Sequence, residues 1–214
     1  MNPKVIDLSH YDDVTDKLVG AKGAGIVGVI HKATQGGTSY DYSYEIRRGY
    51  ARAQGMLWGA YHFNTGDTIP TQVEHFLSGA NPDDDTLMAL DFEDNSLSEM
   101  SLQECVDFLG LLDQKIGRKA VLYSGNRIRE LAPHGGPDTQ AFLSGHRLWL
   151  AEYGPVAKVP PPWENYFLWQ FTGDGVGPEP HNLPGITISG GLDISTFDGS
   201  DDELRARWAG KETS

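Results

Sequence analysis

The feature that most constrains the fold is a series of eight short β-rich runs, several of them nearly continuous in apolar residues. Continuous apolar character is what strands covered on both faces need. The runs are residues 5–10, 25–34, 56–63, 86–93, 120–125, 147–153, 166–172 and 193–197. They predict strands that are covered on both faces, as in an α/β protein, and eight strands suffice to close a barrel.

Helical segments separate the early strands. Residues 41–54 and 70–77 are predicted helices, and 101–116 is the clearest one. Ser101 and Glu104 form a capping-box pattern in front of an apolar helix face. Helices alternating with strands are typical of βα units whose strands run parallel.

The spacers after the fifth strand become rich in proline and glycine, as in residues 155–162 and 173–191. We expect loops there rather than full helices. Ser200 with Glu203 predicts a last short helix through Trp208. The fold class that follows is α/β, with an irregular, incomplete TIM-like barrel in a single domain.

Length and composition limit the possibilities further. A chain of 214 residues with 39% apolar content can bury one substantial core and does not demand a second domain. We expect one domain over residues 1–209 and a frayed tail at 210–214. The single cysteine, Cys105, excludes an internal disulfide and a cysteine-rich metal site, so we interpret it as a core residue.

Charge and hydropathy exclude other functions. The formal net charge of −13 argues against nucleic-acid binding, which needs clustered Lys and Arg. No apolar run approaches the roughly 20 residues that cross a bilayer, and residues 1–4 do not resemble the start of a signal peptide. We therefore expect synthesis in the cytosol, no membrane insertion, and a monomer as the default state.

A cluster of acids follows the fourth strand, in the segment MALDFED. Side chains two apart on a strand share a face, so Asp91 and Glu93 should project together while Phe92 packs on the other side. In a parallel barrel this end of the strand is where active sites form. Close like charges raise one pKa and can supply a protonated acid beside an ionised partner, as glycoside cleavage requires.

Asp7 and Asp193 occur in matching contexts, VIDLS and LDIS, on the first and last strands. Those strands must be neighbours in a closed barrel, so four carboxylates are expected to ring one mouth. An isolated Asp-x-Glu at the end of a strand is most simply a pair of solvent-exposed loop residues. The two additional aspartates favour an active site instead.

Aromatic and amide side chains occupy the other strand ends. Sugars present apolar faces that stack on aromatic rings, although any one ring can equally be a core residue. The candidate groove residues are Tyr61, Phe63, Tyr123, Trp149, Tyr153, Trp169 and Gln170.

The order of these motifs resembles the family 25 lysozymes of the glycoside hydrolases. The matching pieces are VIDLSHY, HKATQG, GAYHF, LDFED, VLYSG, LWLAEYG, LWQF and LDISTFDG, which together cover nearly the whole chain. The resemblance implies a barrel of five βα units followed by three strands. Many phage members also carry a separate wall-binding module, but this chain has no room for one, so we expect the catalytic domain alone. The resemblance also implies hydrolysis, without metal or cofactor, of the β-1,4 bond from N-acetylmuramic acid to N-acetylglucosamine in the glycan strands of bacterial peptidoglycan.

Carried over by position, Glu93 would be the general acid and later the base. Asp91 would stabilise the developing positive centre through the substrate acetamido group, in a retaining reaction, while Asp7 and Asp193 would order the site. Two positions depart from the family pattern. Gln35 stands where an acidic residue is common, and His31 where an aliphatic one is usual.

Several alternatives remain open from the sequence. A chitinase-like or endo-N-acetylglucosaminidase activity would use a similar acid pair. A metal-dependent deacetylase could draw on His10, His31 and His62, although their spacing is not typical of metal ligands. A non-catalytic wall-binding or virion module is the option from another class. The cell wall would be reached by release at lysis, and a phage origin fits that route.

Overall fold

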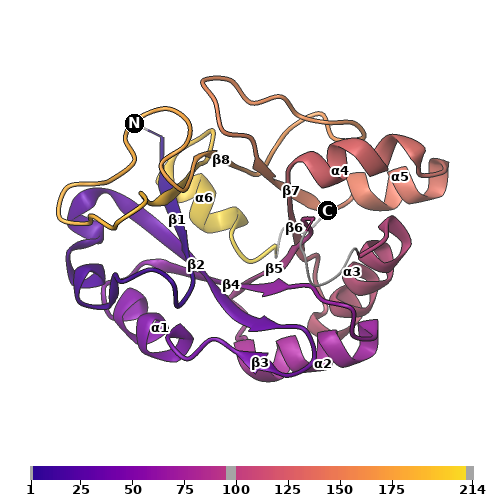
Figure 1. Ribbon diagram of the computed structural model, residues 1–214, viewed down its shortest axis with the longest axis horizontal. Coiled ribbons are helices and arrows are strands. Elements are labelled where there is room, and N and C mark those ends of the chain that lie inside the picture. The colour runs from indigo at the N-terminus through magenta and orange to yellow at the C-terminus, as the bar shows by residue number, and fades with distance from the viewer. Residues whose placement is uncertain (1, 95–99, 211–214) are drawn as a thin grey trace.

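The strands of the chain form a closed barrel, as the computed structural model shows for residues 2–94 and 100–210 (Figure 1). Around the ring the order is β1, β9, β8, β7, β6, β5, β4 and β2, and β2 pairs back to β1. The strand bounds are β1 Lys4–Leu8, β2 Ile26–Gln35, β4 Leu57–Phe63, β5 Leu87–Asp91, β6 Val121–Ser124, β7 Arg147–Ala151, β8 Leu168–Thr172 and β9 Asp193–Thr196. A short strand β3 (Ser39–Tyr40) pairs with the end of β2 outside the ring.

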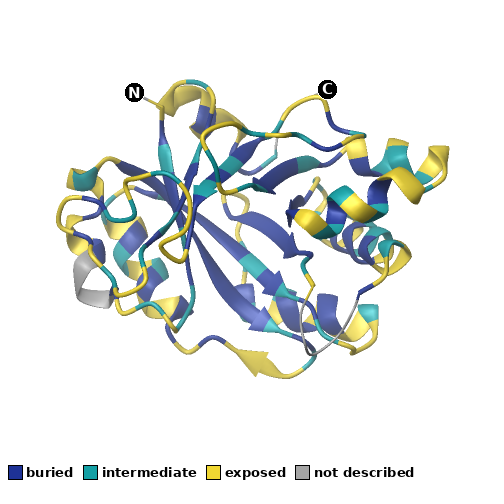
Figure 2. Cartoon of the chain, turned by 45° about the horizontal axis from the view of Figure 1, so that its top comes forward, coloured by how far each residue is buried: buried dark blue, intermediate teal, exposed yellow. Residues whose placement is uncertain are grey.

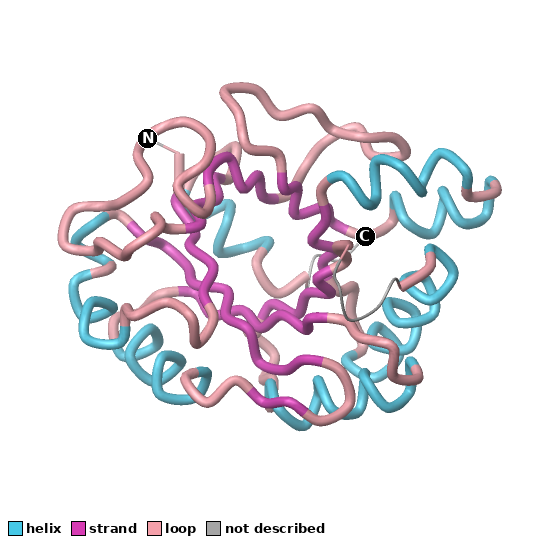
Figure 3. Tube along the Cα trace, viewed as in Figure 1, coloured by secondary structure: helices cyan, strands magenta, loops and turns pink. Residues whose placement is uncertain are grey.

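Helices cover the outside of the first part of the ring (Figure 3). The helix bounds are α1 Tyr44–Ala53, α2 Ile69–Ala80, α3 Leu102–Ile116, α4 Asn126–Leu131, α5 Pro137–Ser144 and α6 Asp201–Arg207, with 3-10 turns at Thr15–Gly20, Lys22–Ala24 and Ala132–His134. The expected plan of five βα units followed by three strands is confirmed. Ser101 and Glu104 do form the capping box of α3.

The last strand departs from the parallel arrangement of the early βα units. β9 is antiparallel to both β1 and β8. The loop of residues 173–192 stays at the end of the barrel where β8 finishes, so β9 starts there and runs back down. This reversal places the first residue of β9, rather than its last, at the barrel mouth.

The core has two layers, one inside the barrel and one between the barrel and its helices (Figure 2). Cys105 lies in the outer layer and is fully buried, so the sole thiol is a core residue as expected. Helix α6 closes the inner layer from below. Its residue Leu204, and Trp208 directly after its end, are buried inside the ring. Trp208 donates its indole N–H to the carbonyl of Trp58 over 2.8 Å, and a Cβ on Gly28 would touch its ring at 3.0 Å.

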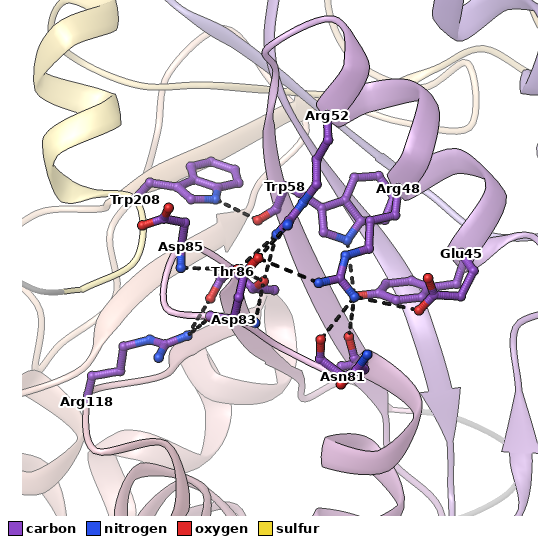
Figure 4. Close-up of polar contacts among 12 residues, drawn as sticks. Glu45, Arg48, Arg52, Trp58, Asn81, Asp83, Asp85, Thr86, Arg118 and Trp208 are labelled. Carbon is purple, nitrogen blue, oxygen red and sulfur yellow. Dashed lines mark hydrogen bonds and ion pairs between the residues drawn. The ribbon is translucent and has the colours of Figure 1, made fainter.

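A polar network ties the elements together at the end of the barrel opposite the mouth (Figure 4). Arg52 donates both to the carboxylate of Asp83 and to the hydroxyl of Thr86. Arg118 donates to the carbonyls of Asp83 and Thr86, and Arg48 forms an ion pair with Asp83 at 3.7 Å. The loop before β5 is thereby fixed to α1 and to the start of β6.

No helix in residues 2–94 and 100–210 has the length and apolar character needed to cross a membrane. The predicted tail at 210–214 lies outside the described residues from position 211 onward. The domain boundary at 209 therefore stays a prediction.

Candidate active site

The proposed acid pair sits at the carboxyl end of β5, in a layer of side chains that crosses four neighbouring strands. Phe63, Asp91, Tyr123 and Trp149 are successive register partners on β4, β5, β6 and β7. Register partners on parallel strands lie at one height, so these four side chains form a single floor. Glu93 follows two residues after Asp91 and lines the same cavity.

The backbone around the pair is pinned. The amide of Phe92 donates to the carbonyl of Tyr123 over 2.9 Å, and the side-chain amide of Asn64 donates to the carbonyl of Asp91 over 3.1 Å. Phe92 is fully buried in the outer core layer. The alternation expected from the sequence is therefore present, with the acids on the cavity side and the phenylalanine on the helix side.

The other two carboxyls come from β1 and β9. Asp7 and Asp193 are register partners, which the antiparallel direction of β9 makes possible at this end of the barrel. Gln170 on β8 donates to Asp7 over 2.9 Å and accepts from the hydroxyl of Tyr123 over 2.8 Å. A hydrogen-bonded chain thus joins Asp7 to the floor layer.

A cavity of about 540 Å³ opens above this floor. Its volume lies within the range typical of small-ligand sites. The residues lining it are Asp7, Ser9, Tyr11, Lys32, Gln35, Tyr61, Phe63, Asp91, Glu93, Tyr123, Trp149, Tyr153, Asp174 and Asp193. All four predicted carboxyls and five of the predicted aromatic residues meet here.

Burial is the main cause that raises the pKa of both Asp91 and Glu93. The charges around them differ. The charge of Glu93 also raises the pKa of Asp91, and Lys32 opposes that rise, whereas Asp174 and then Asp94 raise the pKa of Glu93. Two carboxyls this close resist joint ionisation, so the pair favours holding a proton, which acid catalysis needs.

Asp7 and Asp193 are also held as weak acids. Burial and then the charge of Asp193 raise the pKa of Asp7, and its hydrogen bond from Gln170 opposes that rise. Burial and then the charge of Asp174 raise the pKa of Asp193 to about 7. The mouth therefore collects more carboxyl groups than can all be ionised together at neutral pH.

Two of the predicted groove residues lie elsewhere. Gln170 is buried in the barrel beneath the cavity, where it holds Asp7 rather than lining the opening. Trp169 points the other way, because it is adjacent to Gln170 on the strand. Its ring packs with the outer core layer beside Phe171, and its N–H donates to the carbonyl of Glu152 over 2.7 Å. The expectation that Trp169 lines the groove is therefore not met.

Five lining residues were not among the predicted site residues: Ser9, Tyr11, Lys32, Gln35 and Asp174. Lys32 could have been found, since it is two positions from the inward-facing Ile30 on β2. Its ammonium donates to Gln35 over 2.7 Å and lies 4.8 Å from the centre of the Phe63 ring. Asp174 lies in a loop, for which strand periodicity gives no signal.

Asp174 is held in place by an unusual turn. Its φ of 51° lies in the left-handed region, and its amide donates to Asp193 over 3.0 Å. A Cβ on the preceding Gly173 would collide with the hydroxyl of Tyr153 and with the carboxylate of Asp193. A glycine is therefore required for the loop to pass this closely behind both side chains.

The three histidines weighed as metal ligands do not meet. His10 contacts Asp41, His31 contacts the carbonyl of Lys32, and His62 contacts Thr34 and Gln72. Across residues 2–94 and 100–210, no three His, Cys, Asp or Glu side chains are grouped so that they could hold a metal ion. Burial lowers the pKa of both His31 and His62 to about 4, which is typical of neutral core histidines.

Comparison with known proteins gives consistent matches. The family model described as "Glycosyl hydrolases family 25" matches residues 6–179. The bacterial lysozyme from Streptomyces coelicolor superposes with a TM-score of 0.83 at 23% identity, over 99% of both chains, which shows a shared fold. The muramidase from Acremonium alcalophilum gives 0.79 at 25% identity, over 98% of this chain and 99% of its own. A protein of Escherichia coli O157:H7, "Uncharacterized protein YegX", is 27% identical over 94% of this chain and 71% of its own length.

Proposed function

The chain belongs to the glycosyl hydrolases of family 25, and on that premise we propose that it cleaves the β-1,4 bond from N-acetylmuramic acid to N-acetylglucosamine in bacterial peptidoglycan. The observation that carries this proposal is the shared cavity of Asp91 and Glu93, with Asp7 and Asp193 beside them. Glycoside hydrolases typically use two carboxyl groups that flank the glycosidic bond to be cleaved.

Glu93 is the general acid in this proposal. Its neighbours Asp174 and Asp94 disfavour its charge, so it holds a proton that it can give to the leaving sugar oxygen. Once ionised, the same carboxylate takes a proton from the attacking water. Its partial burial and its position at the cavity wall fit both steps.

Asp91 acts on the substrate rather than on the leaving group. It is 6% exposed, and its Oδ1 has no hydrogen-bond partner within the described part of the chain. A buried carboxylate oxygen without a partner is costly unless a ligand supplies a donor. We assign that donor to the acetamido N–H of the sugar, whose carbonyl oxygen then attacks the anomeric carbon and gives a retaining outcome.

The aromatic residues supply the apolar surface of the cavity. Tyr61, Phe63, Tyr123, Trp149 and Tyr153 surround the carboxyls in the same cavity. Their rings offer apolar faces for sugar C–H groups, and the tyrosine hydroxyls offer hydrogen bonds. This combination suits an uncharged sugar ring better than a phosphate group, which would meet five carboxyls here.

Analysis of the new reducing end tests the proposal. Purified peptidoglycan is digested, the products are reduced with borohydride, and the amino sugars are released and separated. Reduced muramic acid is expected. Reduced glucosamine would instead favour an endo-N-acetylglucosaminidase, and binding to walls without any new reducing end would favour a non-catalytic module. Proton NMR of the first product anomer tests retention.

We place the action of the protein at the bacterial cell wall, and we propose that it works there as a monomer that a phage releases from the cytosol at lysis. Expression in the cytosol is then expected to leave cells intact until the membrane is permeabilised, after which they should lyse. Light scattering of the purified protein should give the mass of one chain. Lysis without permeabilisation would contradict release from the cytosol at lysis. The mass of a dimer would contradict the proposed monomer.

A further inference from the structure

Three aromatic rings stand together on the surface beside the cavity, and we name His10, Tyr11 and Tyr42 the aromatic ledge. Tyr11 is 83% exposed and Tyr42 is 80% exposed. The His10 ring lies between them, with its centre 4.0 Å from that of Tyr11 and 5.3 Å from that of Tyr42. Single exposed apolar residues are ordinary, but grouped exposed rings mark binding surfaces.

The aromatic ledge is continuous with the active site. Tyr11 itself lines the cavity that holds the four carboxyls. It follows Asp7 by four residues, just beyond the end of β1, whereas Tyr42 comes from the segment between β3 and α1. The rings therefore extend the cavity wall outward, away from Asp91 and Glu93.

The position of the aromatic ledge is fixed by a buried carboxylate. Asp41 is 7% exposed and accepts hydrogen bonds from both the backbone amide and the ring Nδ1 of His10, each over 2.8 Å. Asp41 is itself held by the hydroxyl and the amide of Ser43, over 2.6 and 3.0 Å. A surface that is preorganised in this way loses little freedom when it binds a ligand.

We propose that the aromatic ledge is an additional sugar-binding site, which stacks a further pyranose ring of the glycan strand as the strand leaves the catalytic cavity. The inference rests on the proposed function. Ring faces bind the C–H face of a sugar, while the tyrosine hydroxyls and the Nε2 atom of His10 can form hydrogen bonds with its polar substituents. The acids Asp12 and Asp13 follow the ledge directly, which favours an uncharged sugar over an anionic stem peptide.

The test compares Tyr42→Ala with the unchanged protein on two substrates: short peptide-free glycan oligomers that fill only the central cavity, and long peptide-free glycan strands. We expect kcat/KM on long strands to fall about tenfold while short oligomers are cleaved at the normal rate. Tyr42→Phe keeps the ring and should retain most of the long-strand rate. Tyr40→Ala is the matched control, because Tyr40 is 58% exposed but packs on His75 at 4.2 Å, outside the ledge.

Each outcome is decisive. Equal loss on both substrates, no loss on either, or the same loss in Tyr40→Ala would overturn the ledge as a sugar site. Long strands that still carry stem peptides serve as a third substrate, and a loss confined to them would assign the surface to the stem peptide instead. If the unchanged protein cleaves neither substrate, it is the proposed function that fails, and thermal melting of each variant shows whether the fold is intact.

Discussion

Asp7 and Asp193 stand directly opposite each other on β1 and β9, at the seam where the first and last barrel strands pair. Like charges that face each other across an antiparallel pair destabilise a sheet. The chain nevertheless places them there, and the pKa of each is raised. The pairing of Asp7 with Asp193 therefore lowers the free energy of unfolding, while it places two carboxyls at the mouth of the site.

Asp193→Asn is expected to stabilise the protein at neutral pH. The pKa of Asp193 is about 7 in the folded chain, against about 3.9 for an unfolded aspartate. Between these values the folded state binds more protons, so stability falls as pH rises. Each pKa unit is worth about 1.4 kcal/mol, and coupling to the other carboxyls reduces the total to on the order of 2 kcal/mol. Urea unfolding should show the full gain above pH 7 and none near pH 3, and a loss of stability at pH 7 would refute it.

Glu93→Gln is expected to lower kcat on peptidoglycan about a thousandfold, because the amide cannot protonate the leaving oxygen. Stability should be unchanged or higher, since burial already disfavours the carboxylate. Release of reducing ends and thermal melting measure the two effects. Glu130→Gln, on the exposed face of α4, is the control with normal activity. Near-normal turnover in Glu93→Gln would show that Glu93 is not the general acid.

Asp174→Asn should shift the alkaline limb of the kcat/KM profile to lower pH. Several titratable groups share the cavity with Glu93. They are Asp174 in the loop before β9, Asp193 on β9, Asp91 on β5, and Tyr123 and Tyr153 at neighbouring strand ends. Asp174 is the foremost of the charges that raise the pKa of Glu93. Removing it lets Glu93 lose its proton earlier as pH rises.

The control for that change is Asp198→Asn, which removes an exposed charge that raises the pKa of Tyr166 and does not act on Glu93. Its profile should match that of the unchanged protein. If the alkaline limb of Asp174→Asn stays in place, Asp174 does not set the protonation of Glu93.

Lys32→Met should move the acid limb of the same profile to higher pH. The ammonium of Lys32 lowers the pKa of Asp91, so its loss keeps Asp91 protonated over a wider pH range. Activity should fall severalfold at the acid end and recover as pH rises, whereas Lys115→Met, on the exposed side of α3, should change nothing. A loss of equal size at every pH would indicate a binding role for Lys32 instead.

Asp83→Ala should destabilise the chain by about 1 kcal/mol without changing activity, because the network in Figure 4 lies at the end of the barrel opposite the mouth. Its hydrogen bond from Arg52 is the main cause that lowers the pKa of Asp83. The contribution is therefore present above about pH 3.9 and is lost as pH falls through the lower folded value. Chemical unfolding across that range measures it, with Asp198→Ala, an exposed loop acid outside the network, as the control. A large activity loss would show that the network reaches the active site.

Strand alternation explains how much of the site can be predicted from the sequence. It places Asp91 and Glu93 on one face and Phe92 on the other, as the structure has them. The same rule separates Trp169 from Gln170, because neighbours on a strand cannot share a face. The two side chains therefore cannot both face the groove, and it is Trp169 that packs on the helix side.

Features that depend on loops could not be predicted in this way. Asp193 was expected at the mouth beside Asp7, and the antiparallel direction of β9 places its first residue there. That direction depends on the loop before β9, and strand periodicity gives no signal for it. Asp174 depends on a left-handed residue next to a tightly packed glycine, which apolar periodicity does not encode. Helices α4 and α5 were not predicted, although Pro137 at the first position of α5 is a typical helix start.

The indole of Trp208, lodged under the ring of strands, has a consequence for how a polymer is handled. With the lower opening blocked, a chain of sugars cannot thread through the barrel and has to lie across its top. Access from above does not require a free terminus. A linkage deep inside a long wall polymer is then as reachable as one near its end, so cutting at interior positions is the mode of attack that this architecture permits.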